Sequence, residues 1–387
     1  MAPPVVRELW EMEELVEKIL LSIPPEEPEI LVRASLACKP WCRLLSGNAF
    51  RSRYLALHGT APVLGFLQSW VAGELERFVP TKKFCPRSPI PKRESTFVLD
   101  CRHGRVLLGC SEQRHEAVVW DPVSGRRTEL RESDYFCAAA VLCSVDGCDH
   151  AACNSGPFSV ACIEDEGCVD DDEHSLLRAS VYSSDTQKWT SPACIHIGFV
   201  SDNCFMGRPS LLIGKQLYFL LDHGLGILRY DLSRHRLSVI DLPEKLVEHN
   251  PLLISGPGGR LEVVHQDKHG LCVVYSRWSI DGEYRWLYSR AIDLNMLRPI
   301  GHPVSPPVLA GSLEGTDLSI VVTDLGVFTF DRKSLKFKKL SSKKYRYGWD
   351  LAEHIFLYTS FNTIPALAGV VDDQRAGEGG GGDHAEV

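Results

Sequence analysis

The feature that most constrains the fold is a hairpin pattern that recurs along the second part of the chain. Each copy ends a strand on an aromatic or aliphatic residue, continues through a polar turn that usually holds Asp or Ser, and starts a second strand. The clearest copies are residues 118–130, 180–192, 228–240 and 327–340, with a poorer copy at 289–300. Their aromatic residues are Trp120, Tyr182, Tyr230 and Phe330. Because the copies are roughly 40–60 residues apart, the pattern predicts the repeated small sheets of a β-propeller.

Further apolar segments fit the same repeat. Each hairpin copy is accompanied by other strand-like runs, found at 104–110, 215–221, 260–266 and 317–323. These runs are more uniformly apolar than strands of a sheet with one solvated face, as expected when a sheet is buried on both faces. A sixth blade is expected from residues 354–361 pairing with residues 63–69, which would join the two ends of the ring. We therefore predict a propeller-like domain, most simply six-bladed, with an all-β sandwich or barrel as the alternative.

The first 60 residues have a helical pattern instead. Apolar residues recur at helical spacing in residues 13–23, 29–45 and 48–58, so we expect three short helices. The fold class is thus mainly β with a small all-α N-terminal domain. The predicted domains are residues 10–58 (helical), 62–365 (propeller-like) and 366–387, a Gly-rich acidic tail expected to be disordered.

Two positions in this helical region bear on where the helices begin and end. Pro40 lies inside the second helical pattern, where a proline removes a backbone hydrogen bond. Either the helix is kinked there, or it ends near Cys38 and a new helix begins at Pro40, where an initial proline is well tolerated. Asn48 is the candidate N-cap of the last helix.

The charge distribution argues against nucleic acid and membrane partners. The formal net charge is −8, and most of the excess acid lies in residues 164–173 and 372–387, which leaves the rest near neutral. The acidic stretch at 164–173 is interpreted as a solvated insertion loop. Basic runs occur at 81–93 and 331–349. The second has aromatic residues among its lysines, a pattern that is also compatible with nucleic-acid binding. We interpret it instead as an outer blade strand with a lysine-rich solvated face. No run of about 18 apolar residues marks a membrane helix.

The cysteine pattern indicates reduced thiols. The chain has 14 cysteines and no apolar segment typical of a secretory signal near its start, so we expect the cytoplasm, the nucleus or both. Six of them lie near His150, namely Cys137, Cys143, Cys148, Cys153, Cys162 and Cys168. None of these pairs has the Cys-x-x-Cys spacing that holds two thiolates on one tight turn, so we predict buried or loop thiols and no metal. Cys38 and Cys42 lack both redox spacing and a second ligand pair, and we expect Cys38 to be a packing residue and Cys42 to be incidental.

Residues 12–54 resemble the F-box motif through "EELVEKIL", "LVRASLACKPW" and "LLSGNAFRSRY". The following "HGTAPVLGFL" and the β-rich remainder resemble, more weakly, the F-box-associated propeller domain of a large plant family, especially that of grasses. The chain departs from the family pattern at Glu11 and Met12, where the family usually has Leu-Pro, and at Pro40, which replaces a polar or basic residue. In the family, these helices dock on the Skp-type adaptor of an SCF ubiquitin ligase, and through it on a cullin.

The resemblance implies an adaptor-binding surface on the helices. An exposed apolar helix face is also an expected docking surface on physical grounds, although it could instead pack against the propeller. The adaptor-binding residues we predict are Leu15, Ile19, Leu20, Ile23, Pro24, Leu31, Val32, Leu36, Cys38, Trp41, Leu44 and Leu45.

No catalytic motif is present. The chain lacks a Gly-x-Ser-x-Gly elbow, a phosphate-binding Gly-x-x-x-x-Gly-Lys-Ser/Thr loop and a His-Glu-x-x-His zinc motif. Asp121, Asp231, Asp293 and Asp331 are better explained as turn residues of the blades than as a catalytic carboxylate pair. We therefore predict a non-catalytic substrate receptor without a cofactor, whose propeller binds an unidentified target protein; an adaptor-independent scaffold or a diverged, non-functional F-box copy is the alternative.

Overall fold

The structure, a computed structural model, describes most of the helical and β-rich regions. The described residues are 13–59, 61–69, 75–81, 84, 86, 96–110, 117–130, 136–148, 150, 153, 156–168, 174–198, 209–221, 225–246, 251–296, 306–341 and 355–361. Glu11 and Met12, the chain from residue 362 onward and residues 169–173 of the acidic stretch lie outside them, so the predicted tail is not tested.

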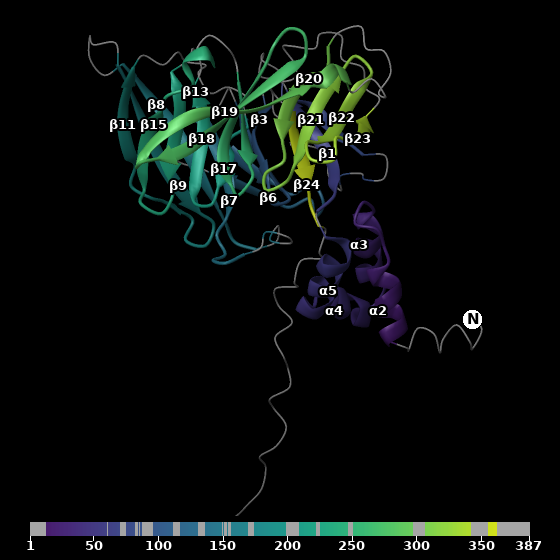
Figure 1. The fold of residues 1–387 in the computed structure, drawn as a ribbon. Coiled ribbons are helices and arrows are strands. Elements are labelled where there is room, and N and C mark those ends of the chain that lie inside the picture. Colours follow the sequence, from purple (N-terminus) through teal and green to yellow (C-terminus); the bar gives the residue numbers. More distant parts are fainter. Residues whose placement is uncertain are drawn as a thin grey trace, which may run out of the picture.

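The N-terminal region is a small helical unit beside one end of a ring of sheets (Figure 1). Its four described helices are α2 (Glu13–Leu21), α3 (Pro28–Ala37), α4 (Lys39–Ser46) and α5 (Asn48–His58). We expected three helices. The extra boundary arises at Cys38, whose extended backbone separates α3 from α4. Pro40 lies in the first turn of α4, where its missing N–H costs no helical hydrogen bond, so the second of our two alternatives is correct. The N-cap of α5 is Gly47 rather than Asn48, and it makes no side-chain cap.

The β-rich region forms six antiparallel sheets. Four of them have four strands each in simple meander order. These are β3 (Thr96–Arg102), β4 (Arg105–Cys110), β5 (Ala117–Trp120) and β6 (Arg127–Leu130); β12 (Leu211–Ile213), β13 (Gln216–Leu221), β14 (Gly226–Asp231) and β15 (Arg236–Ile240); β16 (Leu252–Gly256), β17 (Arg260–Gln266), β18 (Leu271–Ile280) and β19 (Glu283–Asp293); and β20 (Val308–Ser312), β21 (Leu318–Thr323), β22 (Gly326–Asp331) and β23 (Phe337–Ser341).

The other two sheets are less regular. One has five strands, β7 (Phe136–Cys143), β8 (Phe158–Cys168), β9 (His174–Ser183), β10 (Lys188–Trp189) and β11 (Ala193–Gly198). The last sheet combines β1 (Val63–Ser69) and β2 (Leu75–Pro80) with β24 (Ile355–Thr359) from the other end of the propeller. β24 pairs antiparallel with β1, with Phe66 opposite Leu357, which confirms the predicted closure of the ring.

Six hydrophobic clusters lie between neighbouring sheets and complete the ring. Each cluster takes its buried side chains from two adjacent blades, and the six clusters together account for all six interfaces. Trp120, Tyr230 and Phe330 are at most 1% exposed within them, which places the repeated aromatic residue of the sequence pattern in the core. The propeller is thus held together by apolar burial on both faces of each sheet.

Asp121, Asp231 and Asp331 close the turns that follow the third strand of their blades, whereas Asp293 ends the outer strand β19. Asp231 and Asp331 each accept hydrogen bonds from two backbone N–H groups of the following turn, and Asp121 does the same while also binding the Ser124 hydroxyl. Asp293 accepts from the backbone N–H of Asn295. The prediction of turn residues is therefore confirmed, because these are Asx turns that fix the chain reversal.

Two expectations about the blades need correction. In the sheet of β16–β19 the hairpin turn lies at residues 281–282, so residues 289–293 belong to the outer strand β19 and do not start a new hairpin. Residues 164–168 of the acidic stretch continue β8 instead of leaving it as a loop, and Glu164 is buried. The basic run at 331–341 does contain an outer strand, β23, in which Lys338 and Lys339 are exposed as predicted.

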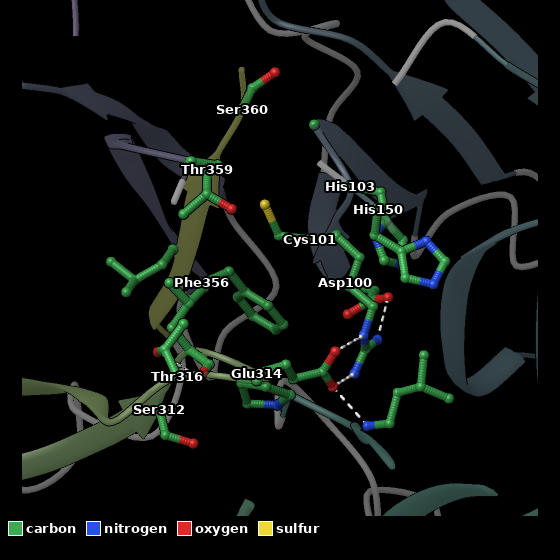
Figure 2. A pocket seen from close by; sticks show the side chains of 18 of the residues that line it. Asp100, Cys101, His103, His150, Ser312, Glu314, Thr316, Phe356, Thr359 and Ser360 are labelled. Carbon is green, nitrogen blue, oxygen red and sulfur yellow. Dashed lines mark hydrogen bonds and ion pairs between the residues drawn. The ribbon is translucent and has the colours of Figure 1, made fainter. Parts of the chain in front are cut away.

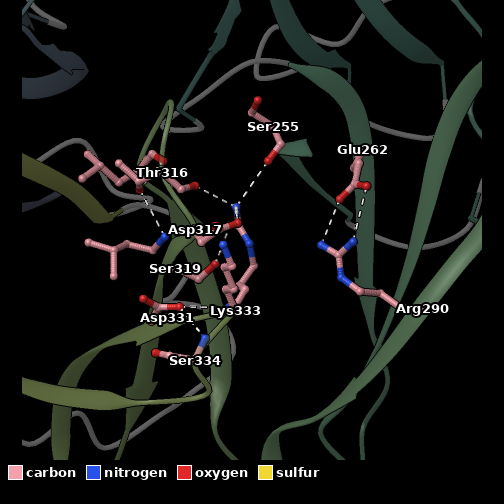
Figure 3. Close-up of polar contacts among 12 residues, drawn as sticks. Ser255, Glu262, Arg290, Thr316, Asp317, Ser319, Asp331, Lys333 and Ser334 are labelled. Carbon is pink, nitrogen blue, oxygen red and sulfur yellow. Dashed lines mark hydrogen bonds and ion pairs between the residues drawn. The ribbon is translucent and has the colours of Figure 1, made fainter. Parts of the chain in front are cut away.

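Polar side chains add ties within and between blades (Figure 3). Glu262, only 1% exposed, pairs with Arg290 at 3.0 Å and accepts a 2.7 Å hydrogen bond from Ser276. Arg332 of the next blade donates to the Ser255 backbone carbonyl at 3.3 Å and so bridges two sheets. These buried charges are compensated, which avoids the cost of an unpaired ion.

Candidate functional site

The helical unit has its own core, and three of the predicted adaptor residues belong to it. Leu20, Leu31 and Leu45 are 1–3% exposed and pack with Val16, Phe50 and Tyr54. Their burial makes them stabilising residues of the unit, not surface contacts. Partly buried positions are Leu15, Ile23, Val32, Trp41 and Leu44, and exposed positions are Ile19, Pro24, Leu36 and Cys38. The expected packing role of Cys38 is therefore wrong, because its extended backbone between α3 and α4 leaves the side chain exposed.

Several large apolar side chains of the helical unit remain exposed. Ile19 on α2, Leu36 on α3 and Leu57 on α5 are 57%, 71% and 63% exposed, and Ile30 is 40% exposed. The adaptor-binding residues predicted from the sequence include Ile19 and Leu36 but not Leu57. Leu57 lies in the expected helix at 48–58, but beyond residues 12–54, which carry the F-box resemblance.

A residue from the closing strand completes the helical core. Phe361, two residues after β24, is 2% exposed in the same cluster, and its ring meets Tyr54 edge-on at 6.4 Å. Tyr54 in turn donates a 2.9 Å hydrogen bond to the Ile23 carbonyl. The helical unit is therefore anchored to the point where the propeller ring closes, as the proximity of β24 to the helices shows (Figure 1).

An apolar groove of about 300 Å³ separates α3 from the propeller. Pro28, Val32 and Leu36 line it on the helix side, and Phe84, Pro86 and Val123 line it on the propeller side. Part of the apolar face that the sequence assigns to a partner therefore faces the chain's own propeller.

A cavity of about 570 Å³ lies at the end of the propeller that meets the helices. Gly59 and Phe361 line it from that side, and residues of several blades line the remainder. Its polar centre is Arg102, whose guanidinium donates to Asp100 at 2.5 Å, to Glu314 at 2.5 and 2.9 Å and to the Ser210 hydroxyl and carbonyl (Figure 2).

The carboxylates around Arg102 are also held by backbone groups. Asp100 accepts from the Val141 N–H at 2.8 Å, and Glu314 accepts from the Leu212 N–H at 2.6 Å. Arg102 and Asp100 together thus join four blades. Sequence analysis did not single out Arg102, because Ser210 and Glu314 lie 108 and 212 residues from it along the chain.

The ionisable groups in this cluster shift one another's pKa values. Burial raises the pKa of Asp100 to about 6 despite the opposing charge of Arg102, and Glu314 adds to the rise. Burial alone would lower the pKa of Arg102, but Asp100 and Glu314 hold it well above its ordinary value. Burial also lowers the pKa of His103 to about 3, aided by the nearby His150. The charged groups of the cavity are therefore tied to one another, an arrangement that holds blades together.

A group of possible metal ligands lies at the rim of the same cavity. Cys143, Cys148, His150 and Cys153 place their ligand atoms within 4.8 Å of one another, and His150 and Cys153 line the cavity. Of the other cysteines considered from the sequence, Cys137 on β7 and Cys162 on β8 take no part in the group, and Cys168 is the last residue of β8. The spacing Cys-x4-Cys-x-His-x2-Cys was the signal available in the sequence, and only the loop geometry showed that all four positions converge.

The β18–β19 hairpin exposes aromatic residues on the outside of the propeller. Trp278 is 41% exposed, while Tyr284 and Tyr288 are 62% and 63% exposed. Arg277 lies over the Tyr284 ring at 4.3 Å, and Arg260 stacks on Trp278. Exposed aromatic and arginine side chains are the residue types enriched in protein interfaces.

Neither a family model nor a curated protein matches this chain. Solved structures that resemble it include the extracellular domain of a hybrid two-component system from B. thetaiotaomicron, with a TM-score of 0.34 and 14% identity. That match covers 70% of this chain, and this chain spans 40% of that one. TolB from Acinetobacter baumannii has a TM-score of 0.37 and 14% identity over 76% of this chain and 68% of that chain. Dihydro-heme d1 dehydrogenase NirN matches with a TM-score of 0.32 and 10% identity over 75% and 77% of the two chains. Within the described residues, no helix has the length and apolar character needed to span a membrane.

Proposed function

We propose that this protein is the non-catalytic substrate receptor of an SCF-type ubiquitin ligase. The observation that carries the proposal is the helical unit, a domain of four short helices with three apolar side chains more than half exposed. Large apolar side chains left exposed on so small a unit are candidate docking contacts. The resemblance of residues 12–54 to the F-box motif suggests that the partner is a Skp-type adaptor and, through it, a cullin.

The adaptor contact is best assigned to Ile19 and Leu36, the two predicted adaptor residues with the largest exposed apolar side chains. Leu57 adds a third candidate from α5. The buried Leu20, Leu31 and Leu45 would support this surface from beneath. In this role the chain holds the target protein beside the conjugating enzyme. Ubiquitin transfer to the target then becomes effectively intramolecular.

The decisive experiment measures the affinity of the full chain for purified Skp-type adaptor by calorimetry or interferometry. We expect Ile19→Ser and Leu36→Ser each to weaken binding about 5- to 30-fold, the loss typical of a well-packed interface residue. Leu335→Ser is the matched control, because Leu335 is 60% exposed but lies on the propeller. Absence of adaptor binding by the unmodified chain would refute the proposal.

The target would be held by the propeller, and we assign this role to the β18–β19 hairpin. Its exposed aromatic side chains, with Arg277 lying over Tyr284, favour an apolar target segment. Proximity labelling in the native tissue should lose specific target proteins with Tyr284→Ser/Tyr288→Ser and retain them with Leu335→Ser. An unchanged labelling pattern would place the target elsewhere on the propeller.

The second candidate is an adaptor-independent scaffold. The groove between α3 and the propeller, together with Phe361 in the helical core, favours it because part of the apolar helix surface is directed at the chain itself. This candidate would be supported if the folded chain does not bind the adaptor but still labels specific proteins in the native tissue.

A further inference from the structure

The connection between β7 and β8 gathers four side chains of the kinds that bind zinc. Cys143 ends β7, and Cys148, His150 and Cys153 follow in the connection. Their ligand atoms all lie within 4.8 Å of one another, and Cys153 Sγ is 3.8 Å from His150 Nδ1. Zinc bonds of about 2.3 Å to sulfur and about 2.0–2.1 Å to nitrogen place neighbouring tetrahedral ligands roughly 3.5–3.8 Å apart. Small side-chain rotations would therefore bring the four atoms onto one ion.

The backbone of this connection is arranged around the sulfur atoms. The Val145 N–H points at Cys143 Sγ at 3.5 Å, and the His150 N–H points at Cys148 Sγ at 3.4 Å. Each donor follows its cysteine by two residues. These N–H groups hold the two sulfur atoms in place, as hydrogen bonds from outside the ligand set do in metal sites. The turn from Val145 to Cys148 is closed by a backbone hydrogen bond and contains Gly147 at a φ of 65°.

Arg105 supports the cluster from the neighbouring blade. Its guanidinium is buried and donates to the Cys153 carbonyl at 2.8 Å and the Gly156 carbonyl at 2.6 Å, and it lies over the Phe158 ring. Three thiolates, a neutral imidazole and a divalent ion carry one net negative charge. A fixed arginine beside them offsets that charge, as outer groups do in metal sites.

We propose that Cys143, Cys148, His150 and Cys153 bind one Zn²⁺ ion in a closed, structural site. Three sulfur ligands and one imidazole suit zinc and exclude the oxygen-seeking Mg²⁺ and Ca²⁺. With four protein ligands no position is left open for water, so the ion would stabilise structure and not catalyse hydrolysis. The ion would cross-link the long β7–β8 connection and so fix its conformation at the rim of the cavity around Arg102.

The site is independent of the adaptor proposal and can be tested on the full chain alone. Protein produced with added zinc and purified without metal-affinity resin or chelators should contain about one zinc per chain by mass spectrometry of the metal. Cys148→Ser should reduce this to below about one fifth of the wild-type content, since three-ligand sites bind zinc far more weakly. Cys194→Ser is the control, because Cys194 is an exposed free cysteine on β11 and lies outside the cluster.

Cobalt substitution distinguishes ligands from bystanders. Co²⁺ added to the metal-free chain should give thiolate charge-transfer absorption, and His150→Cys should retain the ion while shifting the visible bands toward those of an all-thiolate site. Circular dichroism of each variant identifies any that fail to fold. The proposal is overturned if the folded wild-type chain, purified under reducing conditions, takes up neither zinc nor cobalt, or if Cys148→Ser retains full zinc content.

Discussion

Phe361→Ala tests the link between the propeller and the helical unit. The Phe361 ring is 2% exposed and meets Tyr54 in a core otherwise built from α2–α5. Truncating a buried phenylalanine to alanine typically costs about 3–5 kcal/mol, from lost transfer free energy and the cavity left behind. A four-helix unit of this size has little stability to spare. We therefore expect the helical unit to open locally while the propeller remains folded.

Hydrogen exchange followed by mass spectrometry measures this opening segment by segment. A loss of 3–5 kcal/mol corresponds to roughly 100- to 4,000-fold faster exchange of the slowest amides in α5, up to the limit set by global unfolding. Phe66→Ala is the matched control, because Phe66 is 1% exposed in the propeller core between two blades. It should accelerate exchange in its own sheet and leave α5 nearly unchanged.

The result that refutes this reasoning is equally specific. If Phe361→Ala changes α5 exchange by less than about threefold, the contact contributes under 1 kcal/mol and the helical unit is stable without the propeller. If α5 and the propeller sheets accelerate together, Phe361 stabilises the whole chain instead of one unit.

Three further predictions concern charge and helix boundaries. Arg102→Met should lower the free energy of unfolding by about 3–5 kcal/mol in urea titrations, because it leaves two carboxylates without their shared partner; a loss below 1 kcal/mol would contradict the blade-joining role. The raised pKa of Asp100 means that its contribution to stability is present below about pH 4 and is lost as the pH rises through 6. The stability of Asp100→Asn relative to wild type should therefore increase by about 2 kcal/mol from pH 4 to 7, and a flat difference would argue against the shift. Pro40→Arg should change thermal stability by less than about 1 kcal/mol and leave adaptor binding equal or tighter, since Pro40 occupies a first helical turn; marked loss of either would contradict that placement.

The fold was accessible from sequence where local patterns carry it. A recurring hairpin with an aromatic residue and a turn aspartate is a property of a few adjacent residues, so Trp120, Asp231 and Phe330 indicate blades through their sequence neighbours alone. The closing of the ring by β1 and β24 followed from having apolar strands left over at both ends of the repeat. The poorer hairpin copy at 289–300 was placed too late because Asp293 mimics the turn pattern at the end of an outer strand.

The sites were decided by contacts between distant segments, which no local pattern records. Of the predicted adaptor residues, helical spacing alone could not separate the buried Leu31 from the exposed Leu36, because which helix face is covered depends on the neighbouring helices and on Phe361. The same holds for Arg102, because its partners Ser210 and Glu314 come from other blades. It also holds for His150, whose position among three thiols depends on the path of the β7–β8 connection. By itself the sequence determined a ring of small sheets preceded by helices. Tertiary packing, by burying some candidate side chains and bringing others together, decided which residues can meet a partner or a metal ion.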